Sequence, residues 1–108
     1  MLTFTAEYLR DLGTRIFEAA GAPRDIAAEV ARSLVDANLA GHDSHGVLRI
    51  PSYLDLIPSG QLKPAARPEI VKETPTSLLV DGHRTFGQIS GLFATDGVVQ
   101  KAKSQGIA

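Results

Sequence analysis

At residues 41–49 the sequence reads GHDSHGVLR, and a tyrosine follows at position 53. A helix over residues 46–57 would place His45, Arg49 and Tyr53 four residues apart, which puts them on one face of that helix. An imidazole, a guanidinium and a phenol would then face the same space. This set combines a proton donor, a carboxylate ligand and a second hydrogen-bonding group, and it suits a small oxo acid.

Two helices joined by a short turn are predicted before this stretch. Thr5 is suited to cap the first helix and Gly21 to end it. The second helix should open near Pro23 and end near Gly41. Apolar residues recur at helical spacing in both: Leu9, Leu12, Ile16 and Ala20 in the first, and Ala27, Val30, Ala31, Leu34 and Val35 in the second.

A third helix is expected from Gly46 to about Ser59. Asp43 or Ser44 is suited to cap it, and Gly60 to end it. A Pro-punctuated connector then covers residues 60–68.

Residues 69–73 and 77–81 are predicted to form two short strands, followed by a helix over residues 88–104 that ends at Gly106. The expected inner side of that helix consists of Leu92, Thr95, Val98, Val99 and Ala102. Gly91 and Gly97 favour close packing of this helix on another backbone. The predicted class is α+β, with a helical segment over residues 1–60 and the start of a second domain over 61–108.

Composition excludes several classes of protein. The 108 residues carry a formal net charge of −1, without the basic excess typical of nucleic-acid binding. The chain has no Cys, so it has no disulfide framework or thiol nucleophile. No signal peptide and no apolar run of membrane-spanning length is evident, and a cytoplasmic location is expected.

Each candidate site residue also has a plain structural interpretation. Asp43 and Ser44 could simply cap a helix, with His45 at the surface. Arg49 could form a surface ion pair with Asp55 or Glu73. Tyr53 could be a half-buried core residue.

Two further site types have weaker signals. His42, Asp43 and His45 could ligate a metal, but a fourth spaced ligand is missing, and we predict no metal site. Residues 86–91 read FGQISG, which is neither GxGxxG nor a P-loop. A turn into a closely packed helix is the better interpretation of this segment.

Several stretches together resemble the malate/L-lactate dehydrogenase family, whose members are NAD(P)-dependent oxidoreductases without a Rossmann fold. They lie at residues 19–23 (AAGAP), 40–46 (AGHDSHG) with Arg49 and Tyr53, 60–64 (GQLKP), 80–82 (VDG) and 86–88 (FGQ). The resemblance covers essentially the whole chain. It implies that the elements expected here are part of a larger non-Rossmann fold, with residues 61–108 opening an α/β cofactor-binding domain.

The implied activity is interconversion of 2-hydroxy acids and 2-oxo acids, or reduction of a cyclic imino acid, with NAD or NADP. The resemblance makes His45 the proton donor, supported by Ser44, and makes Arg49 the ligand of the substrate carboxylate, with Tyr53 nearby. It also implies a homodimer. No cofactor-binding residue is identified in the chain.

Members of this family are much longer than this chain, so the chain is expected to be the N-terminal part of such an enzyme and inactive in isolation. The alternative is a small helical binding module without catalysis, in which the third helix presents Arg49 and Tyr53 to a partner. A concave face shared by His45, Arg49 and Tyr53 would favour the enzyme, and an isolated exposed His45 would favour the module.

Overall fold

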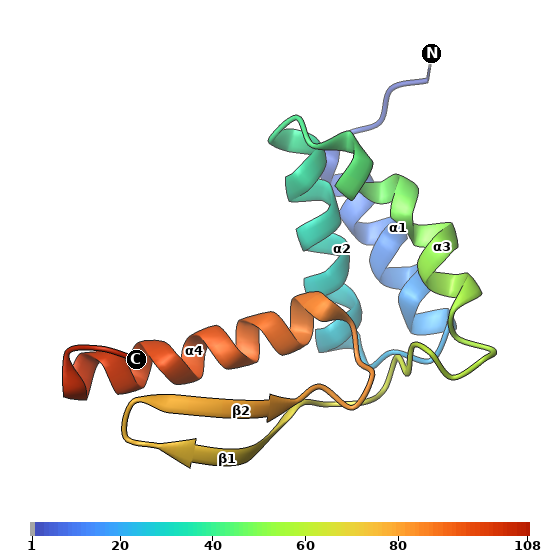
Figure 1. Ribbon diagram of the computed structural model, residues 1–108. Coiled ribbons are helices and arrows are strands. Elements are labelled where there is room, and N and C mark those ends of the chain that lie inside the picture. Colours follow the sequence, from blue (N-terminus) through green and yellow to red (C-terminus); the bar gives the residue numbers. More distant parts are fainter. Residues whose placement is uncertain (1) are drawn as a thin grey trace.

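The computed structural model describes residues 2–108 as an elongated molecule of 50 × 31 × 21 Å. Three helices pack together, and a β-hairpin with the last helix extends away from them (Figure 1). The elements are α1 (Ala6–Ala19), α2 (Arg24–Leu39), the 3₁₀ turns η1 (Asp43–His45) and η2 (Val47–Arg49), α3 (Ile50–Asp55), β1 (Glu69–Thr74), β2 (Ser77–Asp81) and α4 (Gly87–Gln105). The predicted α+β class is confirmed.

Helices α1 and α2 begin and end close to the predicted residues. Thr5 caps α1, since its Oγ1 accepts a hydrogen bond from the backbone N–H of Tyr8 at 3.1 Å. Four predicted stops adopt positive φ, which glycine tolerates without a steric penalty. They are Gly21 (108°), Gly41 (85°), Gly60 (78°) and Gly106 (83°).

The apolar stripe of α2 forms the centre of the core. All five predicted positions are at most 1% exposed, and Ile26 joins them. On α1 the buried residues are Gly13, Thr14 and Phe17, while the four predicted apolar positions are only half-buried. The buried stripe of α1 is therefore rotated relative to the prediction, because Phe17 provides its large apolar contact.

Phe86 and Leu62 are buried in this core although both lie beyond residue 60. The ring of Phe86 contacts Phe17 edge-on, with a centroid distance of 5.2 Å. Such an aromatic pair contributes beyond its buried area. The chain that follows the three helices thus remains attached to them through two buried side chains. The assignment of residues 61–108 to a cofactor-binding domain stays a prediction.

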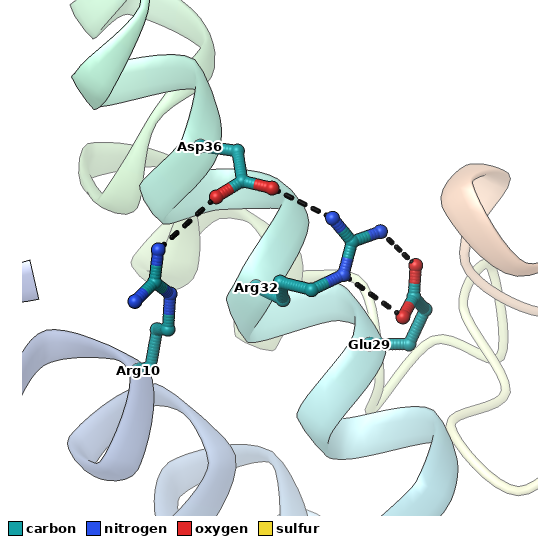
Figure 2. Close-up of polar contacts among 4 residues, drawn as sticks. All are labelled: Arg10, Glu29, Arg32 and Asp36. Carbon is teal, nitrogen blue, oxygen red and sulfur yellow. Dashed lines mark hydrogen bonds and ion pairs between the residues drawn. The ribbon is translucent and has the colours of Figure 1, made fainter. Parts of the chain in front are cut away.

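A chain of ion pairs crosses from α1 to α2 (Figure 2). Asp36 accepts from Arg10 at 3.3 Å and from Arg32 at 2.6 Å, and Arg32 also pairs with Glu29. The contacts with Glu29 raise the pKa of Arg32 above its usual value. The side chains of Arg10 and Asp36 are 41% and 44% exposed, so solvent screens this network.

The two strands pair antiparallel, from Glu69 opposite Asp81 to Thr74 opposite Ser77, as the sequence predicts. Helix α4 packs against β2, and a Cβ at Gly97 would overlap the side chain of Leu78. Gly97 is thus closely packed as expected, but against a side chain and not against another backbone. At Gly91 the prediction is wrong, because an added Cβ would meet open space.

Helix α4 has no buried residue within the described chain. Of its predicted inner side, Val98 and Ala102 are half-buried, whereas Leu92, Thr95 and Val99 are exposed. Ile70 and Leu79 in the hairpin are also exposed, at 42% and 58%. This end of the molecule therefore contributes little to the core. No helix within residues 2–108 is long and apolar enough to cross a membrane.

Candidate functional site

The segment between α2 and α3 is held by one side chain, Asn38, near the end of α2. Its Nδ2 donates to Asp43 Oδ1 at 2.8 Å, and its Oδ1 accepts from the backbone N–H of Val47 at 2.9 Å. Gly46 is buried against the same amide, where a Cβ would overlap Asn38. The path of residues 42–47, which includes Ser44 and His45, is thus fixed by a contact from α2.

The single third helix predicted from Gly46 to Ser59 is wrong. Gly46 has extended dihedrals (φ −94°, ψ −154°), so it separates two 3₁₀ turns, and α3 covers only six residues with Pro51 in its first turn. The predicted caps are also wrong. Neither η1 nor α3 has a side-chain cap, because Asp43 accepts from Asn38 and Ser44 contacts its neighbour His45.

His45, Arg49 and Tyr53 nevertheless line one cavity of about 410 Å³. Turns η1 and η2 carry the first two residues and α3 carries the third, so the cavity collects them without one continuous helix. The rest of the lining is Ser33, Ala37 and Gln88. His45 and Arg49 are exposed at its surface, and Tyr53 is half-buried.

Ser44 is outside this lining and contacts the site through the imidazole. Its Oγ lies 3.0 Å from Nδ1 of His45, within hydrogen-bond distance. A partner on one ring nitrogen fixes the ring orientation and leaves the other nitrogen for a second partner. Ser44 can therefore orient His45.

The Arg49 side chain is anchored within its own segment. Its Nε donates to the backbone oxygen of Ser44 at 2.7 Å. Among residues 2–108 it forms no ion pair with Asp55 or Glu73, and Glu73 instead pairs with Lys101 at 3.0 Å. The surface-pair interpretation is therefore wrong. The terminal N–H groups of Arg49 remain available for a carboxylate.

Tyr53 is half-buried, as the core interpretation predicts, and it also lines the cavity. Its ring packs in the core, with centroids 6.1 Å from Phe86 and 6.4 Å from Phe17. Its hydroxyl reaches the cavity and accepts a hydrogen bond from Gln88 Nε2 at 3.0 Å. Tyr53 thus joins the core to the cavity.

No group of three His, Cys, Asp or Glu side chains within the described part of the chain is arranged to hold a metal ion. The rings of His42 and His45 lie 6.4 Å apart and nearly perpendicular. His42, Asp43 and His45 therefore do not converge on one point.

Asn38, Ser33 and Gln88 were not identified from the sequence. Asn38 and Ser33 lie in a helix where polar residues are ordinary, so their spacing gave no signal. Gln88 stands in a stretch noted for its resemblance, but it is 35 residues from Tyr53 and the contact depends on the fold. Only the position of Gln88 directly after a Phe-Gly pair at a helix start could have drawn attention to it.

A second cavity of about 430 Å³ shares Tyr53 and Gln88 with the first. Its remaining lining contains no charged side chain: Leu56, Gln61, Leu62, Thr85, Phe86 and Gly87. A dinucleotide carries a pyrophosphate, which requires several N–H donors or cations. The cavity that holds His45 offers one guanidinium, from Arg49. The residues lining these two cavities do not form a nicotinamide-dinucleotide site.

A family model for malate/L-lactate dehydrogenase matches residues 4–108. The chain belongs to the malate/L-lactate dehydrogenase family. This confirms the resemblance seen in the sequence. Within this family, the chain is 39% identical over 105 residues to hydroxycarboxylate dehydrogenase B of Escherichia coli O157:H7. The match covers 97% of this chain and 29% of that protein.

Solved structures of the malate/L-lactate dehydrogenase family have the same fold over this region. Malate dehydrogenase from Pyrococcus horikoshii OT3 superimposes with a TM-score of 0.91 at 32% identity, over 97% of this chain and 30% of the other. Δ1-piperideine-2-carboxylate reductase from Pseudomonas syringae pvar. tomato gives 0.85 at 31% identity, over 96% and 31%. The chain thus spans roughly three tenths of the length of the family members it matches.

Proposed function

We propose that this chain forms the proton-donor and carboxylate-binding part of an NAD(P)-dependent oxidoreductase that interconverts 2-hydroxy acids and 2-oxo acids. The observation that supports this most is the cavity shared by His45, Arg49 and Tyr53. A cavity that collects an imidazole, a guanidinium and a phenol favours the enzyme over the small helical binding module. Membership of the malate/L-lactate dehydrogenase family supports the same choice.

Arg49 binds the substrate carboxylate in this proposal. Its Nε donates to the Ser44 carbonyl, so the two terminal nitrogens remain for the ligand. A guanidinium holds a carboxylate through charge-assisted hydrogen bonds, which fix orientation as well as position. Orientation converts a loose encounter into a defined geometry for reaction.

His45 donates a proton to the carbonyl oxygen during reduction and accepts it back during oxidation. The Ser44 hydroxyl at Nδ1 leaves Nε2 as the nitrogen that serves the substrate. A positioned acid stabilises the negative charge that develops on this oxygen. The nicotinamide cofactor supplies the hydride in this class of reaction, and the residues that hold it are not among those lining the two cavities.

The substrate class follows from what the proposed groups recognise. Relatives are named for malate, for L-sulfolactate and for Δ1-piperideine-2-carboxylate. A carboxylate next to a carbinol, carbonyl or imine carbon is common to these compounds. In the proposal Arg49 binds the carboxylate, and His45 exchanges a proton with the neighbouring group. The expected homodimer and cytoplasmic location stay predictions.

The test is oxidation of NADH and NADPH by a panel of 2-oxo acids and Δ1-piperideine-2-carboxylate. It is run with the protein expressed from its complete reading frame and, in parallel, with residues 1–108 alone. We expect turnover with at least one substrate in the first sample and none in the second. Lack of turnover by the complete protein with every substrate would contradict the proposed function. Turnover by residues 1–108 would contradict the assignment of cofactor binding to other residues.

A further inference from the structure

We propose that Gln88 is a positioning residue, which fixes the Tyr53 hydroxyl as a hydrogen-bond donor toward a substrate oxygen. This inference rests on the proposed function of the cavity. It assigns a role to the start of α4, a part of the chain far in sequence from His45, Arg49 and Tyr53.

Gln88 lies where the two cavities meet. It is the second residue of α4, and together with Tyr53 it lines both cavities. Phe86, directly before α4, is 2% exposed and packs on Phe17 and Tyr53. This buried anchor fixes the start of α4, so the amide of Gln88 is held in place against the phenol.

The direction of the hydrogen bond decides what Tyr53 can do. A phenol has one proton to donate and can also accept. Gln88 Nε2 donates to Tyr53 Oη at 3.0 Å, which uses the hydroxyl as an acceptor. No acceptor for the Tyr53 proton is found among residues 2–108, so this proton is available in the cavity that also contains Arg49 and His45.

A carboxylate or carbonyl oxygen is only a hydrogen-bond acceptor, so it requires a donor from Tyr53. If the partner at position 88 were itself an acceptor, the phenol would donate to that partner and present only lone pairs to the substrate. In the structure the amide nitrogen of Gln88 faces the phenol, and this orientation leaves the phenol proton for the ligand. Gln88 thereby selects ligands that accept at this point of the cavity.

The kinetic test uses the protein expressed from its complete reading frame. It compares Q88M and Q88E in the parent protein, which has Tyr53, and in the Y53F variant. The methionine is similar in size and removes the donor, and the carboxylate accepts the phenol proton. We expect Q88M to raise KM about threefold and Q88E about tenfold or more, in line with the loss of one hydrogen bond. We expect kcat and the unfolding temperature to stay close to the parent values. A change in KM without a change in unfolding temperature separates positioning from a structural role.

In the Y53F background, Q88M should leave KM unchanged, and the effect of Q88E should shrink at least threefold, because the hydroxyl it acts through is absent. Equal effects of each substitution in both backgrounds would overturn the proposal, since Gln88 would then act without Tyr53. A Q88E protein with the KM of the parent would overturn it as well.

A second measurement does not depend on turnover. NMR follows the hydrogen exchange of the Gln88 side-chain amide in the parent protein and in its Y53F variant. The exposed Gln100 is the internal reference. We expect Gln88 exchange to accelerate about threefold or more in Y53F, while Gln100 stays constant. Unchanged Gln88 exchange would overturn the contact itself. A responsive Gln88 in a protein without any turnover would instead locate the failure in the proposed function, and the substrate role of Gln88 would fall with it.

Discussion

Gly46 lies directly against the side-chain amide of Asn38, with no room for a Cβ between them. Asn38 holds Asp43 on one side and the Val47 backbone on the other. Because His45 lies between these two attachment points, the contact between a helix residue and a loop glycine determines where the imidazole is placed.

Replacing Gly46 with Ala should lower the free energy of unfolding by about 1–3 kcal/mol, because the added methyl forces Asn38 out of place. The matched control is G91A, where the Cβ meets open space in a helix. There alanine should stabilise by about 0.5–1 kcal/mol. Urea unfolding followed by circular dichroism measures both. A G46A protein as stable as the parent would show that Asn38 does not confine the loop.

The Asn38–Asp43 contact predicts that a swapped pair restores a damaged site. N38D keeps the acceptor for Val47 but places two carboxylates together, which should cost about 1–3 kcal/mol of unfolding free energy. In N38D/D43N the carboxylate is at position 38 and the amide at position 43. Their hydrogen bond can form again, so most of the lost unfolding free energy should be regained. The same denaturant titrations test it. A double variant no more stable than N38D would contradict the pairing.

Arg67 and Asp25 predict a measurable pKa shift. Both terminal nitrogens of Arg67 donate to the carboxylate of Asp25 at 2.9 Å, and these bonds hold the pKa of Asp25 below its ordinary value of 3.8. In R67Q the pKa should rise toward 3.8. NMR titration of the Asp25 carboxyl carbon reads this directly.

The sign of the stability effect follows from the lowered pKa. A carboxyl group with a lowered folded-state pKa contributes stability above its unfolded value, and this contribution is lost as the pH falls through the folded value. The parent should therefore exceed R67Q in stability at neutral pH, and the difference should disappear in acid. A difference that grows in acid would contradict the account.

Asp36 links the two long helices through exposed ion pairs. D36N should lower the unfolding free energy by less than about 1 kcal/mol, because solvent and salt screen such contacts. The loss should shrink in about 1 M salt, where the Debye length is near 3 Å. A loss that is large and independent of salt would show that Asp36 acts through packing instead.

The sequence predicted those elements that depend on local periodicity. The stripe that includes Val30 and Leu34 repeats at helical spacing, and both side chains are 0–1% exposed in α2. The hairpin follows from two short β-prone runs around Thr74-Pro75-Thr76, and the two strands do pair antiparallel. His45, Arg49 and Tyr53 were also predicted as one group, and they do line one cavity.

Contacts between distant residues could not be predicted in this way. The third helix is interrupted because Asn38 takes the Val47 amide and Asp43, and neither interaction is visible in helical spacing. Gln88 reaches Tyr53 only after Phe86 has entered the core. His45 and Arg49 do lie in one cavity, as predicted. The reason given for this, one continuous helix, is wrong.

The kcat of H45Q in the protein from its complete reading frame tests the central claim most directly. Its matched control is H83Q, since His83 pairs with Glu69 at 2.8 Å and does not line the His45 cavity. Loss of a general acid should lower kcat by about 10²–10⁴-fold in H45Q, with H83Q near the parent value. A kcat within about threefold of the parent in H45Q would contradict His45 as the proton donor.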